Sequence, residues 1–224
     1  MLTVHHLNNS RSQRLLWLLE ELEVPYEIKK YQRGADLLAP KELKQVHPLG
    51  LSPIITDGDV TLAESGAIIE YVIEKYGGSK AHPPESGKIH DLYFKHYVEG
   101  SLMPLLVNSL IFTIVPQRAP FIIRPLVRPI FNMLLAQMVT PRLKEHAKMI
   151  EDHLTKDSKQ WLAGGTEPTA SDFIMSFALE SWATKDPEIL GPNTKAYVKR
   201  IHERPAYQRG LEKGGEYAYG QPKL

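Results

Sequence analysis

The chain has 224 residues, which is enough for one large domain or two small ones, and its 42% hydrophobic content can supply a substantial core. The 27 Lys and Arg residues nearly balance the 26 Asp and Glu residues, so the net charge of +1 does not indicate binding to nucleic acid or anionic lipid. No cysteine is present, which excludes disulfides, catalysis by a protein thiolate and cysteine-ligated metal sites. Any thiol chemistry must use a bound molecule.

Residues 1–78 alternate between strand patterns and helix patterns. Strands are predicted at 2–7, 26–31, 54–57 and 60–62, and helices at 10–22, 41–46 and 65–76. The order is strand, helix, strand, helix, strand, strand, helix. A βαβ unit joined to a ββα unit predicts a small mixed sheet with helices on its faces, which is the α/β thioredoxin-like plan.

Residues 79–88 have the Pro-rich and Ser-rich composition of a linker, and residues 89–224 show no convincing strand pattern. The second domain is therefore predicted to be all-α. Its helices are expected near 89–115, 121–154, 169–184, 192–202 and 205–213. Thr169 and Asp172 have the spacing of a capping box before an apolar run, so we interpret Asp172 as a structural residue.

No metal site, membrane span or secretory signal is expected. The nine histidines lack metal-ligand spacing, and residues 102–115 are shorter than the roughly 20 residues of a membrane helix. The first residues do not combine a basic region with an apolar one, so a cytoplasmic location is predicted.

Two short segments of the first domain are expected to form a binding site. Pro53 opens a strand and removes one backbone donor, which leaves the backbone of Ser52 free to bond a ligand. Glu64 and Ser65 stand where a helix should begin, and a helix start with free amides suits a carboxylate. The structural alternative is that Ser65 only caps its helix and Pro53 only begins its strand.

These segments, Ser52-Pro53 and Glu64-Ser65-Gly66-Ala67-Ile68, resemble the glutathione site of the glutathione transferases. The resemblance extends over residues 1–213 and includes Leu162-Ala163-Gly164-Gly165, Ser171-Asp172-Phe173 and Arg204-Pro205-Ala206-Tyr207. It implies that Ser52, beside a cis Pro53, binds the central backbone of glutathione. It also implies that Glu64 and Ser65 hold the γ-glutamyl end.

Ser10 follows the first strand and could simply cap the next helix. Because Ser10 and Arg14 precede an apolar helix, the segment resembles serine-type transferases of the fungal and bacterial branch near the theta and phi classes. In that interpretation the Ser10 hydroxyl donates a hydrogen bond to the glutathione sulfur and favours the thiolate. Ser12 is the nearest rival, and Asn8 and Asn9 are weaker candidates.

The sequence departs from the family pattern at Leu51, where members often carry a polar residue that contacts glutathione. The glycyl carboxylate then needs another cation, and the sequence does not rank the candidates. They are Arg11, Lys41, Lys44 and His47. Arg11 could instead be a solvated cation at the helix start.

A hydrophobic second substrate is expected against the first long helix of the helical domain. Its predicted contacts are Tyr97, Met103, Leu106 and Phe112, although each could be an ordinary packing residue. Residues 116–129, rich in Pro and Arg, could form an adaptable helix pair at the pocket mouth or a membrane-touching surface. We favour the first, so membrane contact is not expected.

The sequence thus predicts a homodimeric glutathione transferase that conjugates hydrophobic electrophiles, reduces organic hydroperoxides, or does both, in a detoxifying role. Glutathione is the co-substrate and no metal takes part. The alternatives are a non-catalytic protein of the same fold that binds glutathione or hydrophobic ligands, and a regulatory protein of that fold.

Overall fold

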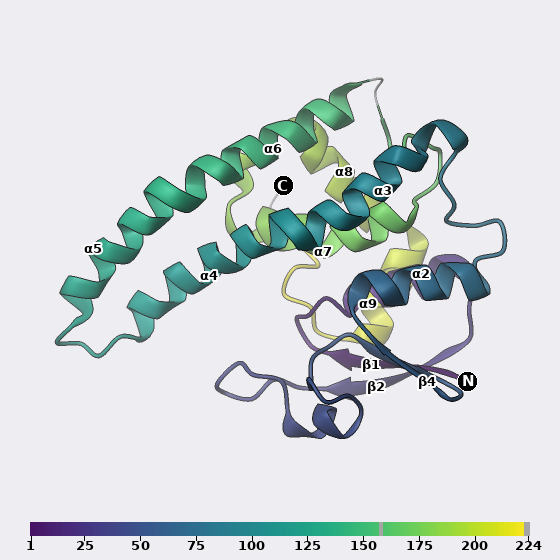
Figure 1. Ribbon diagram of the computed structural model, residues 1–224, viewed down its shortest axis with the longest axis horizontal. Helices are drawn as coiled ribbons and strands as arrows, with labels where there is room; N and C mark the ends of the chain where they lie inside the picture. The colour runs from purple at the N-terminus through teal and green to yellow at the C-terminus, as the bar shows by residue number, and fades with distance from the viewer. Residues whose placement is uncertain (157–158, 222–224) are drawn as a thin grey trace.

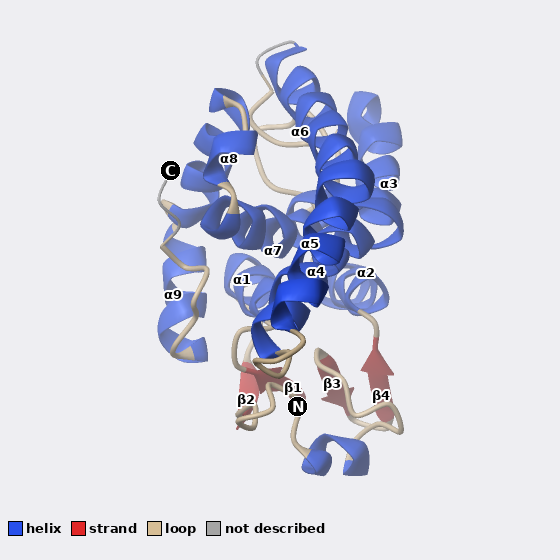
Figure 2. Ribbon diagram, turned by 90° about the vertical axis from the view of Figure 1, so that its left-hand side faces the viewer, coloured by secondary structure: helices blue, strands red, loops and turns tan. Residues whose placement is uncertain are grey.

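The computed structural model describes residues 1–156 and 159–221. A four-stranded sheet lies toward one end of the molecule, and most of the remaining structure is helical (Figures 1 and 2). The strands are β1 (Leu2–Leu7), β2 (Tyr26–Tyr31), β3 (Ile54–Asp57) and β4 (Val60–Ala63), in the order β2-β1-β3-β4. β1 pairs with β2 in parallel, and the other two pairs are antiparallel. This arrangement confirms the predicted mixed sheet.

The first domain also contains α1 (Gln13–Leu22), the short 3-10 helix η1 (Lys41–Gln45) and α2 (Ser65–Tyr76). Figure 2 shows α1 and α2 between the sheet and α7 (Ala170–Lys185), with α9 (Pro205–Gly214) beside α1. Leu43 of η1 belongs to a separate small core with Leu7 and Ile54. Helix α1 begins later than the predicted Ser10, because the Ser10 side chain accepts a hydrogen bond from the Ser12 amide and replaces a helical bond there.

In the residues that the structure describes, the helical part contains two long, nearly continuous helices and three shorter α-helices. The elements are η2 (Glu85–Gly87), α3 (Lys88–Tyr97), the π-helical turn η3 (Val98–Leu102), α4 (Met103–Arg118), α5 (Arg124–Leu134), the π-helical turn η4 (Leu135–Val139), α6 (Thr140–Thr155), α7 (Ala170–Lys185), η6 (Pro187–Ile189), α8 (Pro192–His202) and α9 (Pro205–Gly214). The predicted helical segments are all present. The far halves of the two long helices, α4 and α5, project away from the other elements (Figure 1).

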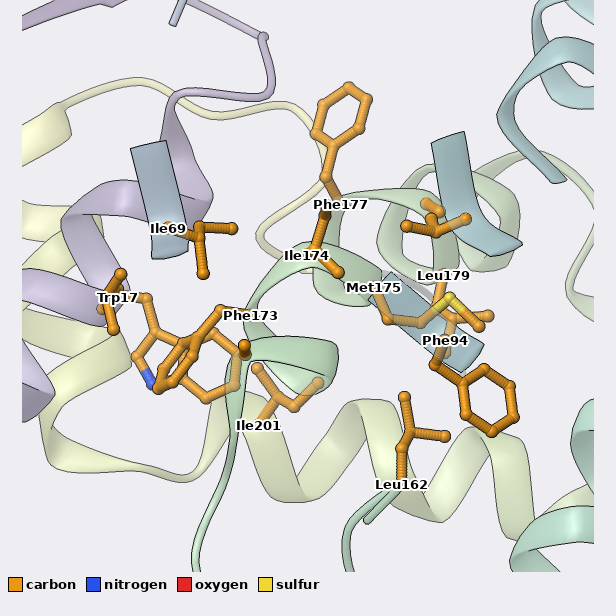
Figure 3. Close-up of a cluster of buried hydrophobic side chains, with 14 of the residues drawn as sticks. Trp17, Ile69, Phe94, Leu162, Phe173, Ile174, Met175, Phe177, Leu179 and Ile201 are labelled. Carbon is orange, nitrogen blue, oxygen red and sulfur yellow. The ribbon is translucent and has the colours of Figure 1, made fainter. Parts of the chain in front are cut away.

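One continuous core joins the sheet, α1 and α7. Trp17 of α1 lies 4.5 Å from the Phe173 ring of α7 and 6.0 Å from the Tyr207 ring of α9, measured between ring centroids. Figure 3 shows Trp17 and Phe173 packed together, with Ile201 of α8 beside Phe173. Because α7 is buried on nearly all sides, its apolar residues do not form a single stripe.

Asp172 has the structural role that the sequence predicts. Its carboxylate accepts hydrogen bonds from the Leu162 amide at 2.9 Å, the Thr169 amide at 2.8 Å and the Tyr197 hydroxyl at 2.7 Å. Thr169 and Asp172 complete the capping box of α7. Burial raises the pKa of Asp172 to about 6. Through its hydrogen bonds to Leu162, Thr169 and Tyr197, the side chain ties the loop before α7 to α8.

Within the described residues, one helical stretch satisfies the length and composition of a membrane span. It runs from Glu85 to Arg118 and includes an 18-residue window with a mean hydropathy of 1.7. The prediction that this region is too short considered residues 102–115 alone, whereas α3, η3 and α4 run on without a break. Asp91, in α3, accepts hydrogen bonds from Thr169 and Ser171, so the first half of the stretch is part of the core.

Candidate active site

Three segments meet at one edge of the sheet. In the register, His5 of β1 lies opposite Ile54 of β3, and Ile54 lies opposite Ala63 of β4. The end of β1, the start of β3 and the end of β4 therefore share this edge. The loop after β1 carries Ser10, the residues before β3 are Ser52 and Pro53, and β4 leads directly into α2. The fold thus gathers the residues predicted to bind glutathione and to act on its sulfur.

Ser52 and Pro53 are joined by a cis peptide bond, as the resemblance implied. The Ser52 hydroxyl donates a hydrogen bond to the His5 carbonyl at 3.1 Å, which fixes the segment against β1. Ladder pairing of β3 begins at Ile54. The backbone groups of Ser52 therefore lie outside the sheet and can face a bound peptide.

The N-terminus of α2 opens toward the same edge. Ser65 is buried as the first helical residue, and the first backbone bond of the helix joins the Ile68 amide to the Glu64 carbonyl at 2.9 Å. Glu64 is exposed and has a φ angle of 73°, an uncommon conformation for a residue with a side chain. The amides of Ser65, Gly66 and Ala67 precede the first intrahelical bond, so this end suits an anion.

Ser10 belongs to a chain of hydrogen bonds that the sequence did not indicate. Its hydroxyl lies 2.8 Å from the Ser12 hydroxyl, which lies 2.8 Å from Nδ1 of His6 in β1. All three side chains are buried. Burial, together with the positive charge of Lys30, lowers the pKa of His6 to about 4, so the imidazole is neutral near pH 7. The strand pattern shows that His5 and His6 face opposite sides, but it does not show that His6 meets Ser12.

The candidate cations for the glycyl carboxylate differ in the contacts that they already make. Arg11 pairs with Glu99 at 3.5 Å, and the fully buried Arg14 binds the same carboxylate. Lys41 is exposed at the start of η1. The Lys44 side chain covers Gly50, where a Cβ atom would lie 2.6 Å from Lys44 Cγ. The lysines of η1 are therefore beside the loop that leads to Ser52, whereas Arg11 already faces an acid.

Two more cation candidates surround the site loops. His47 is half-buried, and its Nδ1 accepts a long hydrogen bond of 3.4 Å from the Leu49 amide. Arg33, which sequence reasoning did not single out, donates from Nε to the Asn8 carbonyl at 3.3 Å. Its backbone amide donates to Asn8 Oδ1 at 2.9 Å. Arg33 therefore holds the loop that carries Ser10.

The predicted contacts of the second substrate are mostly packing residues. Tyr97, Met103 and Leu106 are buried in the main core, and the Tyr97 hydroxyl lies 2.6 Å from Nδ1 of His146. Phe112 is half-buried and packs against Phe131 of α5, with 5.6 Å between ring centroids. The structure therefore does not gather these four residues around Ser10.

The C-terminal tail supplies an aromatic surface closer to the site loop. The Ala218 amide donates to Asn9 Oδ1 at 2.7 Å, directly beside Ser10. The Tyr219 ring packs 5.5 Å from Phe177 of α7, and the Tyr217 hydroxyl donates to Glu180 at 2.6 Å. The tail thus crosses the site loop and joins it to α7.

Comparisons with known proteins place the chain in a family. Residues 1–74 match the model of the glutathione S-transferase N-terminal domain. Glutathione S-transferase 3 of Schizosaccharomyces pombe is 36% identical, covering 95% of this chain and 88% of that protein. Glutathione S-transferase 1 of Saccharomyces cerevisiae is 32% identical, covering 95% of both chains.

Solved structures agree with these relatives. A glutathione S-transferase from Actinobacillus pleuropneumoniae superposes with a TM-score of 0.75 at 28% identity, covering 97% of this chain and 94% of that one. A theta-class glutathione S-transferase from Xanthomonas axonopodis pv. citri, solved with glutathione bound, has the same fold, with a TM-score of 0.70 at 21% identity over 94% of this chain and 96% of that one. The chain belongs to the glutathione S-transferase family.

Proposed function

We propose that this protein is a glutathione transferase that activates the glutathione thiol with the Ser10 hydroxyl. The observation that carries the proposal is the position of Ser10. It lies at the sheet edge shared with the cis Ser52–Pro53 bond and the α2 N-terminus, and its hydroxyl is held by Ser12 and His6. The yeast relatives named glutathione S-transferase support the assignment.

In this proposal residues 1–78 bind glutathione. The backbone of Ser52 pairs with the central part of the peptide, and Glu64 with Ser65 holds the γ-glutamyl end. Glu64 binds its ammonium group, while the free amides of α2 bind its carboxylate. Lys41 and Lys44 are better placed than Arg11 for the glycyl carboxylate, because Arg11 is paired with Glu99.

The chain of hydrogen bonds sets the direction of the Ser10 proton. The Ser12 hydroxyl has two acceptors within reach, the Ser10 oxygen at 2.8 Å and the Leu7 carbonyl at 3.3 Å. In this proposal neutral His6 donates from Nδ1 to Ser12, and Ser12 donates to the nearer Ser10 oxygen, so the Ser10 hydroxyl must donate elsewhere. The bound sulfur is the acceptor that we propose. A hydrogen bond to the thiolate stabilises the charged form and lowers the thiol pKa. The thiol proton passes to solvent, and the thiolate attacks the second substrate without a covalent protein intermediate.

We propose that the second substrate is a hydrophobic electrophile or an organic hydroperoxide, held over the helical domain. The tail residue Tyr219, half-buried against the buried Phe177, offers an apolar surface beside the site loop, and Phe112 lies farther along α4. The test is turnover with a chloronitrobenzene and, separately, with an aryl hydroperoxide, for the wild-type protein and Ser10→Ala. Activity that falls in the variant while glutathione still binds supports the proposal. Glutathione binding without turnover of either substrate by the wild type would favour a ligand-binding protein.

We propose further that the protein is a cytoplasmic homodimer. Ile89, Leu92 and Tyr93 expose apolar surface at helical spacing on α3, away from the core side that holds Phe94. Light scattering on the purified protein gives the mass directly. A dimer that dissociates in Leu92→Glu supports α3 as an interface, whereas a monomeric wild type would refute the dimer.

A further inference from the structure

The hairpin of α4 and α5 exposes far more apolar surface than its own folding needs. We call residues 103–134 the arm and residues 119–126 its tip. Inside the arm, Phe112 packs on Phe131, and Arg124 donates to the carbonyls of Gln117 at 2.9 Å and Ala119 at 3.1 Å. These contacts close the hairpin. The outward side chains are not needed for closure, yet many of them are apolar.

Exposure is greatest at the tip, which is the part of the arm farthest from the sheet and core helices (Figure 1). Phe121 is 84% exposed, Ile122 is 85% exposed and Leu126 is 72% exposed. Helix α5 has no buried residue at all. Single exposed apolar residues are common, but a contiguous group of large ones at the end of a projection marks an interaction surface.

The exposed residues continue from the tip as ordered stripes. On α5, Leu126, Ile130 and Met133 follow one another at spacings of four and three, so they share a face of the helix. On α4, Val107, Ile111 and Val115 are exposed at spacings of four. Arg124 and Arg128 lie roughly half a turn around α5 from its apolar stripe. Helix α5 therefore has an apolar face and a basic face, which is the pattern of helices that lie in a membrane interface.

The charge of the arm favours an anionic partner. Residues 103–134 contain three of the 27 Lys and Arg residues of the chain, which are Arg118, Arg124 and Arg128, and none of its 26 Asp and Glu residues. The near-zero net charge of the whole chain hides this separation. A two-fold contact between two arms would bring like charges together, whereas an anionic bilayer supplies the missing negative charge.

We propose that the arm docks on the surface of an anionic phospholipid bilayer, with Phe121, Ile122 and Leu126 in the boundary between headgroups and acyl chains. The arm lies on the membrane and does not span it. Met103, Leu106 and Ser109 of α4 are buried, and Ser109 accepts a hydrogen bond from Lys185 of α7 at 2.6 Å. Crossing the bilayer with α4 would break this packing, whereas docking of the tip leaves it intact.

The test is flotation of the full-length protein with vesicles of phosphatidylcholine alone and of phosphatidylcholine with about 30% phosphatidylserine. The wild type should float with the anionic vesicles and lose binding as salt is raised. Phe121→Ser/Ile122→Ser should lower the partition coefficient by about tenfold or more, since both contacts with the acyl boundary are removed. Arg118→Gln/Arg128→Gln should lower it by about tenfold or more on anionic vesicles only.

Leu38→Ser is the matched control, because Leu38 is 65% exposed in a loop of the N-terminal domain. It should bind vesicles like the wild type. All variants should keep the mass and the thermal midpoint of the wild type, which separates lost docking from lost folding. Absence of wild-type binding, or equal binding to neutral and anionic vesicles, would overturn the proposal. A tip variant that dissociates a dimer, with no vesicle binding by the wild type, would assign the arm to a second copy.

Discussion

Replacement of Ser12 by Ala tests whether Ser10 depends on its neighbours. Ser12 lies 2.8 Å from Ser10 and 2.8 Å from His6, so its loss leaves the Ser10 oxygen with the amide of residue 12 alone, at 3.2 Å. The lost orientation is worth about one neutral hydrogen bond, or about 1 kcal/mol, which corresponds to about 0.7 units in the pKa of the bound thiol. Ser10→Ala removes the bond to the charged sulfur itself, worth about 1.5–3 kcal/mol or roughly 1–2 units.

The assay is the pH dependence of kcat/KM for Ser10→Ala, Ser12→Ala and the double variant. The apparent pKa of the rate should rise by the smaller amount in Ser12→Ala and the larger amount in Ser10→Ala. Because Ser12 acts through Ser10, the double variant should match Ser10→Ala. Additive effects would show that Ser12 contacts the sulfur independently. A larger effect of Ser12→Ala than of Ser10→Ala would assign the activating hydroxyl to Ser12.

The other predictions concern binding and stability. Glu64→Ala and Ser65→Ala should each weaken glutathione binding by about 1–3 kcal/mol in calorimetry while kcat changes little, and unchanged affinity would disprove the placement of the γ-glutamyl end. The pKa of His6 is about 4, below its ordinary value of 6.5, so the unfolded chain binds more protons between these values and stability should fall as pH drops through this window. Denaturant titrations should show a loss in the free energy of unfolding of up to about 3 kcal/mol in the wild type and a smaller loss in His6→Gln. An equal loss in the variant would show that His6 is not the group responsible. Asp172→Ala removes the acceptor of three buried donors and should cost about 4 kcal/mol, lowering Tm by about 10 °C, while the exposed Asp152→Ala should change it little.

Local patterns were sufficient to predict most of the fold. The bounds of β1 and β2 coincide with the predicted strands at 2–7 and 26–31, because strand patterns mark both and Pro25 separates β2 from the helix before it. The start of α1 was predicted three residues early. There, a side-chain hydrogen bond between Ser10 and Ser12 competes with the helix, and such a competition depends on geometry rather than on composition.

The site could be predicted only where its residues belong to local motifs. Ser52, Pro53, Glu64 and Ser65 stand at strand and helix boundaries that the sequence marks. His6 could not be assigned a role, because its contact with Ser12 requires β1 and α1 to pack together. For a similar reason the sequence could not rank Arg11 against the η1 lysines as the cation for the glycyl carboxylate, because the ion-pair partner of Arg11, Glu99, is 88 residues away.

For the arm, the sequence shows the charge but not which apolar side chains are exposed. Its positive charge can be counted from residues 103–134, but the sequence favoured a helix pair at a pocket mouth. Apolar helices of this kind are usually buried in a core. Only the structure shows that Phe121 and Ile122 face solvent, and this exposure is the observation behind the proposed membrane contact.

The central claim is that the protein activates the glutathione thiol, and titration of the bound thiol tests it most directly. The measurement is the ultraviolet absorbance of the thiolate as a function of pH, with glutathione at saturating protein. The account predicts a thiol pKa clearly below that of free glutathione in the wild type, and a return toward the free value in Ser10→Ala. Binding with no shift in the wild-type thiol pKa would contradict the account.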